Sequence, residues 1–237
     1  MIYSIFDIMS TMIRNAISTQ VFEVLRHRIV SLQIVPGAKL NISALSKELS
    51  VSAIPIREAL KQLIERGLVY STPDIGYHAV NLSEQDVRDI FELRQLLETF
   101  AVEKAIECIS QIELKTLYEE TCELLEGEIP QEQLRTKFDQ ADIKLHKELI
   151  IGNSGNKYVK LLYMYDFISI VRHLNERMLT AAQEHLGIID ALREKNVTKT
   201  QHRLCKHLDN SLKECLPIPQ SGFEWPSRSN LGFRGRG

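Results

Sequence analysis

The sequence is poor in cysteine, and its four thiols, Cys108, Cys122, Cys205 and Cys215, include no C-x-x-C pair. It also lacks an apolar run long enough to span a bilayer, and no basic region precedes its apolar first residues. A secreted disulfide framework, a membrane span and a secretory signal are therefore not expected. The expected setting is a reducing cytoplasm, with free thiols and no membrane partner.

A marked excess of one charge is also missing. The formal net charge is −2 over 237 residues, so the chain is not a polycation. The charges are nevertheless unevenly placed. Residues 1–82 hold 8 lysines and arginines against 6 acidic residues, whereas residues 83–216 hold 18 against 24. A mildly basic front and an acidic back fit a DNA-reading domain joined to one that stays off DNA.

Length and composition predict how the chain is divided. A chain of 237 residues can form one large or two modest domains, each with its own core. Strand signals occur only in the first part and disappear from Ser83 onward. The last 21 residues contain three prolines, four glycines and three arginines, which is typical of an unstructured tail. We therefore expect an N-terminal domain over 1–82, a C-terminal domain over 83–216 and a disordered tail over 217–237.

The most informative stretch runs from residue 40 to residue 80. Asn41 is a candidate N-cap for a first short helix, and Ser52 is a candidate N-cap for a second. The second helix has apolar residues at helical spacing and is expected to end at Gly67. Two short strand patterns follow, joined by a turn rich in proline, aspartate and glycine. Two helices, a tight turn and a hairpin together describe a winged helix-turn-helix.

The exposed stripe of the second helix suggests what this unit binds. Ala53, Arg57 and Lys61 recur every four residues and lie on one face. Such a face can enter a major groove, where Arg57 would reach a guanine or a phosphate. The alternative is a helical hairpin with a solvated basic stripe, and the pattern alone leaves both interpretations open.

Helical patterns account for the rest of the folded chain. In the first domain a helix is expected over residues 17–32. Its expected apolar stripe consists of Val21, Val24, Leu25, Ile29 and Leu32. In the second, long amphipathic stretches separated by short breaks predict an antiparallel bundle of six helices. The expected fold class is therefore mostly α. The predicted bundle helices span residues 83–108, 112–125, 131–151, 157–180, 181–194 and 198–216.

The second domain carries a set of potential metal ligands. Asp142 and His146 are four residues apart on one predicted helix, so both side chains leave from one face. His185 and His207 lie on two later helices. One carboxylate and three imidazoles facing a bundle interior would suit Zn²⁺ or a similar divalent ion. The alternative is that these histidines have structural or solvated roles, as helical histidines usually do.

The stretch VSAIPIREALKQLIERGLV resembles the signature of the GntR family of bacterial transcriptional regulators, and residues 35–40 are similar to its PG-x-x-L entry segment. The chain departs from the usual signature at Ala53 and Ile54, where arginine and threonine are common, and Leu32 stands where glycine is common. The resemblance implies a winged helix-turn-helix that binds DNA. The implied DNA-contacting residues are Ser43, Ser52, Ala53, Ile54, Arg57, Lys61, Gly76 and His78.

The second domain is similar to FCD domains, the all-helical effector domains of one GntR subgroup. Their D-x-x-x-H pair, E-H element and final histidine match Asp142, His146, His185 and His207. The resemblance implies that these four residues bind a divalent metal. Zn²⁺ is the first expectation, and Ni²⁺ and Mn²⁺ are alternatives.

Two further residues match effector-binding elements of that subgroup. Glu92-Leu93-Arg94 is similar to its E-x-R element, which implies that Arg94 faces the metal cavity and meets a carboxylate. The alternative for Arg94 is an ion pair with Glu98. Asn156 matches an S-x-N loop and would contact the effector or cap a helix.

The leading functional hypothesis is a ligand-responsive transcriptional regulator. It would bind a palindromic double-stranded DNA operator as a homodimer and sense a small organic acid at or near the metal. A metal-dependent hydrolase or lyase on a helical bundle is the main alternative from another class. A constitutive DNA binder with a purely structural metal is the third.

Overall fold

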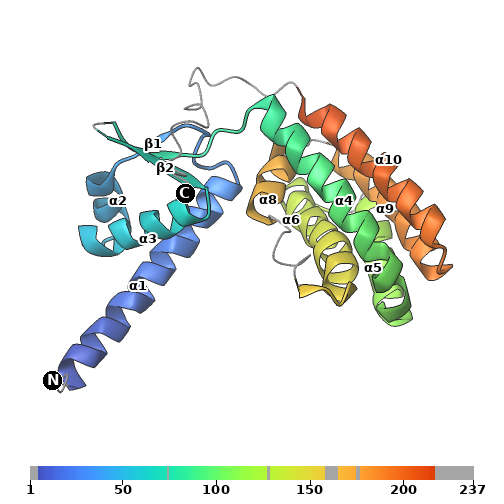
Figure 1. Ribbon diagram of the computed structural model, residues 1–237, viewed down its shortest axis with the longest axis horizontal. Coiled ribbons are helices and arrows are strands. Elements are labelled where there is room, and N and C mark those ends of the chain that lie inside the picture. The colour runs from blue at the N-terminus through green and yellow to red at the C-terminus, as the bar shows by residue number, and fades with distance from the viewer. Residues whose placement is uncertain (1–4, 74, 127–128, 158–164, 175–176, 217–237) are drawn as a thin grey trace, which may run out of the picture. The chain divides into compact units, whose positions relative to one another are not determined.

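The computed structural model describes residues 5–73, 75–126, 129–157, 165–174 and 177–216 (Figure 1). The predicted tail over 217–237 lies outside these residues. The chain divides into two compact units, with the change between Ser83 and Glu84. Within the described residues, no helix is both long and apolar enough to cross a membrane.

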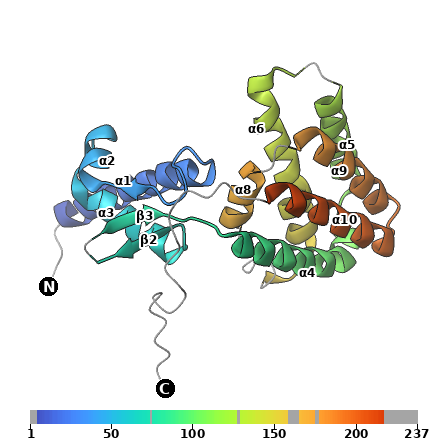
Figure 2. The same ribbon diagram turned by 90° about the horizontal axis from the view of Figure 1, so that it is seen from above.

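The first unit combines three helices with a small antiparallel sheet. Its strand order is β1-β3-β2, so the hairpin strand β3 lies between its partner β2 and the short strand β1. Figure 2 shows β2 and β3 side by side. Helix α3 packs against both α1 and α2. The elements are α1 (Ile5–Val30), β1 (Lys39–Leu40), α2 (Ile42–Glu48), α3 (Ala53–Glu65), β2 (Val69–Thr72) and β3 (Gly76–Ala79).

Local chemistry explains where these helices begin and end. The Asn41 side chain accepts a hydrogen bond from the backbone N–H of Ala44 at 3.0 Å, as expected of an N-cap. Ser52 occupies the N-cap position of α3, although its side chain makes no capping hydrogen bond. Helix α3 is followed by Gly67 at φ 74°, a left-handed conformation that glycine adopts without steric cost. The predicted winged helix-turn-helix is therefore present.

Three details of the first unit differ from the sequence prediction. Helix α1 begins at Ile5 rather than at residue 17. Its inner face uses Phe22, which is buried, whereas the predicted core residue Val24 is 39% exposed. Strand β1 was not predicted, because two residues are too few to show an alternating pattern. Leu32, which stands where the family commonly has glycine, has a φ of 60°.

The second unit is a bundle of helices, as predicted. Helix α4 packs on α10 and on η1, while α9 packs on both α5 and α10. Leucine, isoleucine and alanine side chains fill the spaces between the helices. The elements are α4 (Glu84–Cys108), α5 (Gln111–Leu125), α6 (Gln131–Asp142), the π-helix η1 (Ile143–Ile151), α8 (Tyr165–Leu174), α9 (Met178–Arg193) and α10 (Val197–Cys215).

Two of the predicted helices need correction. The helix predicted over 131–151 is continuous, but its second half is the π-helix η1, a rare form that often occurs at functional sites. The helix predicted over 157–180 lies partly outside the described residues. Its last residues belong to α9, which begins at Met178 instead of residue 181.

Candidate DNA-binding surface and metal centre

The predicted recognition stripe lies on the surface of the first unit. Ala53, Ile54, Arg57 and Lys61 are all exposed along α3, and Ile54 is 54% exposed. A large apolar side chain left in water at the start of a recognition helix is available for contact with thymine methyl groups. Ser52 is exposed directly before the helix.

Two other predicted contact residues lie beside the wing. Ser43, near the start of α2, and Gly76, at the start of β3, line one hollow of about 400 Å³ together with Lys39. Gly76 has a φ of 96°, so a residue with a side chain would be strained at this tight turn. The hollow opens between the helix-turn-helix and the hairpin.

His78, one of the residues expected to contact DNA, is not on the surface of the first unit. His78 is only 5% exposed, and its ring stacks on Tyr70 with 5.4 Å between the ring centroids. The register explains this burial. His78 on β3 pairs with Tyr70 on β2 and with Lys39 on β1, so it lies in the middle of the sheet. A hairpin pattern read from sequence cannot show which face a third strand and the helices will cover.

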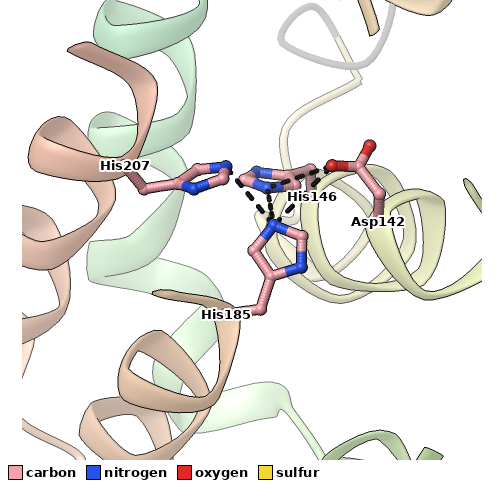
Figure 3. A group of neighbouring side chains, drawn as sticks. All are labelled: Asp142, His146, His185 and His207. Carbon is pink, nitrogen blue, oxygen red and sulfur yellow. Dashed lines mark hydrogen bonds and ion pairs between the residues drawn. The ribbon is translucent and has the colours of Figure 1, made fainter. Parts of the chain in front are cut away.

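The four predicted metal ligands come together in the bundle of the second unit (Figure 3). Asp142 ends α6, His146 lies in η1, and His185 and His207 lie on α9 and α10. All four are buried, and their ligand atoms lie within 4.8 Å of one another. Residues up to 65 positions apart in sequence thus converge on one point.

The atoms that face this point are the Nε2 atoms of the histidines. His185 Nε2 lies 3.4 Å from His146 Nε2 and 3.3 Å from His207 Nε2. Asp142 Oδ1 lies 3.7 Å from the Nε2 atoms of both His146 and His185. One oxygen and three nitrogens therefore surround a common centre.

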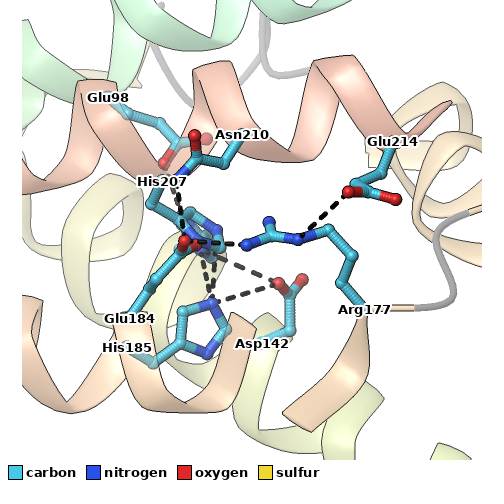
Figure 4. Close-up of polar contacts among 9 residues, drawn as sticks. Glu98, Asp142, Arg177, Glu184, His185, His207, Asn210 and Glu214 are labelled. Carbon is cyan, nitrogen blue, oxygen red and sulfur yellow. Dashed lines mark hydrogen bonds and ion pairs between the residues drawn. The ribbon is translucent and has the colours of Figure 1, made fainter. Parts of the chain in front are cut away.

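Two carboxylates stand behind the histidine rings, and neither was predicted as a site residue. Glu98 Oε2 lies 2.6 Å from Nδ1 of His146. Glu184 Oε2 lies 2.8 Å from Nδ1 of His207 (Figure 4). Glu98 is on α4, 48 residues before its histidine, so only the tertiary packing joins them. A signal for Glu184 existed, because it is the acidic half of the E-H element. His185 stacks instead on the Phe138 ring.

Of the two interpretations of Arg94, the structure shows the ion pair. Arg94 Nε donates to Glu98 Oε1 at 2.8 Å, and both side chains are buried. Arg94 is thus connected to the cluster of potential metal ligands by way of Glu98, which contacts His146. Asn156 lies in the loop after η1, where its backbone N–H donates to Ser154 Oγ at 3.4 Å. Roles for Arg94 and Asn156 in effector binding stay predictions.

Both supporting carboxylates are held in the ionised form. Burial raises the pKa of Glu98, but Arg94 and His146 more than offset this and bring the pKa to about 2. Burial also raises the pKa of Glu184. Hydrogen bonds from His207 and two other residues outweigh it, so this pKa too is about 2.

Burial favours the neutral form of His185 and His207. Burial lowers the pKa of His185 well below its usual value, and the neighbouring His207 and His146 lower it further. Burial also lowers the pKa of His207, although its hydrogen bond to Glu184 acts in the opposite direction. Neutral imidazoles can donate a lone pair to a metal at neutral pH.

The donor set fits a divalent metal. An ionised carboxylate can only accept a hydrogen bond, so Nδ1 of His146 and of His207 must carry the proton. In a neutral ring the lone pair is then on Nε2, and the Nε2 atoms of both histidines face the common buried centre. His185 Nε2 has only one position for a proton and lies within reach of both other Nε2 atoms, whereas a cation at the centre would satisfy all three nitrogens.

Comparisons with known proteins agree with both units. A model of the gntR family of bacterial regulatory proteins matches residues 17–78, and a model of the FCD domain matches residues 89–210. The HTH-type transcriptional regulator YdhC of Bacillus subtilis (strain 168) is 32% identical over 211 residues, which cover 86% of this chain and 93% of YdhC. The repressor RspR of Escherichia coli (strain K12) is 24% identical, with 88% and 93% covered.

Solved structures share the fold. A GntR regulator from Rhodococcus sp. RHA1 gives a TM-score of 0.69 at 20% identity, covering 86% of this chain and 99% of its own. E. coli McbR/YncC gives 0.66 at 20% identity, covering 84% and 96%. The metal-free FCD domain of TM0439 gives 0.51 at 29% identity, covering 57% of this chain and 94% of that domain.

The relatives named above are transcriptional regulators and not enzymes, so the hydrolase or lyase alternative is discarded. The FCD match alone spans half of the chain, and the identity to YdhC extends over most of it. The chain therefore belongs to the GntR family of bacterial transcriptional regulators, as a DNA-binding regulator with a C-terminal FCD effector domain.

Proposed function

We propose that this regulator holds one Zn²⁺ between Asp142, His146, His185 and His207 and responds there to a small organic acid. The observation that carries the proposal is the convergence of three Nε2 atoms and one carboxylate oxygen on a buried centre. A site built from such donors is typical of zinc. Ni²⁺ and Mn²⁺ are the alternatives.

The spacing of the donor atoms favours zinc. Nitrogen ligands at about 2.0–2.1 Å in a tetrahedral arrangement lie about 3.3–3.4 Å apart. The separations of His185 Nε2 from His146 Nε2 and from His207 Nε2, 3.4 and 3.3 Å, have this length. Asp142 Oδ1 is more distant, at 3.7 Å from two of the nitrogens. The wider spacing leaves room for a further ligand on the side of Asp142.

The charge of the site supports an anionic effector. The charged groups around the centre are the buried Asp142, Glu98 and Arg94 and the partly exposed Glu184 and Arg177. Three negative charges, two positive charges and a divalent metal leave a net charge of +1. An uncompensated buried charge is costly, and one carboxylate ligand at the metal would neutralise it. Arg94 and Asn156 remain the proposed effector contacts.

A homodimer is the proposed assembly, with α4 at its interface. Leu96 is 62% exposed and Phe100 is 45% exposed, on the face of α4 opposite Glu98. Two copies of α4 could pair antiparallel through this outer face, with the two-fold axis at the level of residue 98 along the helix. Leu96 would then meet Phe100 of the partner subunit. The same pairing sets Glu92 against Lys104 of the partner subunit, so opposite charges flank the apolar contact.

A two-fold dimer would read a palindromic operator, with half-sites about one helical turn apart. The proposed contacts are the exposed residues of α3, with Ser43, Ser52 and Gly76 beside them. Because operator DNA is in the bacterial cytoplasm, this is the proposed location of the protein. Effector binding would change the relative position of the two DNA-binding units in the dimer. This change would alter the affinity of the dimer for its operator.

The proposal is tested in two steps. Sequencing of genomic DNA captured by the purified protein identifies the operator. A thermal-shift screen of the zinc-loaded protein then compares carboxylates with neutral sugars and amines. We expect carboxylates to raise the Tm and to change operator affinity. Stabilisation by neutral or cationic compounds only would contradict the anion at the metal. Zinc-dependent stability without any small-molecule response would favour the constitutive binder.

A further inference from the structure

Behind two of the proposed metal ligands, side chains form two similar hydrogen-bond series, each running from an arginine through a glutamate to a histidine. On the α4 side, Arg94 Nε donates to Glu98 Oε1 at 2.8 Å, and Glu98 Oε2 lies 2.6 Å from Nδ1 of His146. The Glu98 side chain is fully buried, and that of Arg94 is 7% exposed. Each carboxylate oxygen of Glu98 thus has its own partner.

The second hydrogen-bond series joins α9 to α10 (Figure 4). Arg177, at the N-cap of α9, donates through Nη2 to Glu184 Oε1 at 2.8 Å. Asn210 Nδ2 donates to the same oxygen at 2.8 Å. Glu184 Oε2 lies 2.8 Å from Nδ1 of His207. Both oxygens of Glu184 are engaged, so the carboxylate has little freedom to turn.

The arginine partners give these contacts a direction. Glu98 is ion-paired with Arg94 and Glu184 with Arg177, each at 2.8 Å, so both act as carboxylates. An ionised carboxylate only accepts hydrogen bonds, so the Nδ1 atom that faces it must donate. A ring that donates through Nδ1 can bind a metal only through the lone pair of Nε2. Hydrogen bonds of this kind orient metal-ligating histidines and raise their basicity.

We infer that Glu98 and Glu184 are positioning residues that fix the tautomers of His146 and His207, so that both present Nε2 to the metal. Arg94 and Arg177 hold the two carboxylates in place. The inference rests on the proposed metal site and deepens it. It also gives Arg94 a role that requires no effector. Replacement of Arg94 should therefore weaken metal binding as well as any ligand response.

The test compares E98Q and E184Q with E103Q in the full-length protein. Glutamine keeps the size of the side chain but removes the charge. Glu103 is exposed on the same helix as Glu98 and serves as the matched control. Zinc affinity is measured by competition with a chromophoric chelator. We expect E98Q and E184Q each to bind zinc about 10–100-fold more weakly, and E103Q to bind like wild type.

A second measurement separates positioning from general stability. Long-range ¹H–¹⁵N NMR spectra of the metal-free protein report which ring nitrogen carries the proton. Wild type and E103Q should show the Nδ1–H form at His146 and His207. E98Q should change the tautomer ratio at His146 alone, and E184Q at His207 alone. A purely structural role would lower the Tm without this residue-specific change.

The outcomes are distinguishable. Unchanged tautomers in both variants, with or without lower zinc affinity, would overturn the inference. If E98Q does not fold, E184Q decides it, because the Glu184 side chain is 23% exposed and tolerates replacement more easily. If wild type binds no zinc, the proposed metal site fails, and the tautomer measurement still tests the inference by itself.

Discussion

At the residue scale, local backbone strain makes a prediction at Lys195. This residue follows Glu194, the C-cap of α9, and has a φ of 53°, in the left-handed region that favours glycine. Its ion pair with Glu107 is exposed and so contributes little. Lys195→Gly should therefore raise the free energy of unfolding by about 0.5–1 kcal/mol.

Urea unfolding of Lys195→Gly and Lys206→Gly checks this expectation. Lys206 is exposed inside α10, where glycine should cost about 1 kcal/mol. The two variants should therefore shift in opposite directions from wild type. A loss of stability in both would show that Lys195 is not strained.

Single residues also show how far the sequence could be interpreted. Asp142 and His146 were identifiable because their spacing puts them on one face of a helix, whatever the fold. Glu98 was identifiable only as a neighbour of Arg94, since nothing in the sequence places it beside a histidine 48 residues away. For His78 the prediction was wrong because a hairpin pattern does not show which of its side chains the rest of the fold covers.

At the scale of elements, α3 makes the next prediction. Arg57 is exposed in the middle of its outer stripe. Arg57→Ala should weaken operator binding by about 1–3 kcal/mol if the side chain reads a base. Fluorescence anisotropy with the captured operator measures the change. Lys213→Ala, on α10 in the other unit, is the control and should bind like wild type.

An unchanged affinity of a folded Arg57→Ala protein would remove this residue from the interface.

The elements themselves were largely predictable, because caps and apolar spacing act locally. Asn41 and Gly67 mark the limits of the helix-turn-helix in the structure as they do in the sequence. The π-helical geometry of η1 was not predictable, since its residues also fit an ordinary α-helix.

At the scale of the whole molecule, the outer face of α4 predicts the oligomeric state. Leu96→Glu with Phe100→Glu would place four new charges at the centre of the proposed two-fold contact. We expect light scattering after gel filtration to show a dimer for wild type and a monomer for this variant. Ile112→Glu is the control, because Ile112 is 77% exposed on α5 and outside that face. A dimer that survives the double change would exclude this interface.

The stability of the whole metal-free protein should fall on acidification. His185 and His207 have lowered pKa values in the fold, so below about pH 6.5 the unfolded chain binds protons that the folded chain does not. Glu98 and Glu184 act in the same direction at lower pH, from their ordinary value of 4.5 down to about 2. Urea unfolding in chelator between about pH 8 and pH 5 measures this loss. A stability that rises on acidification would contradict it.

The central claim is that one divalent metal is bound by three imidazoles and one carboxylate in the second unit. X-ray absorption at the zinc edge, on protein loaded with one equivalent of zinc, tests it most directly. The account predicts imidazole nitrogens at about 2.0–2.1 Å, an oxygen at a similar distance, and loss of this signal in His185→Ala. Sulfur ligands at about 2.3 Å, or an unchanged spectrum in His185→Ala, would contradict it.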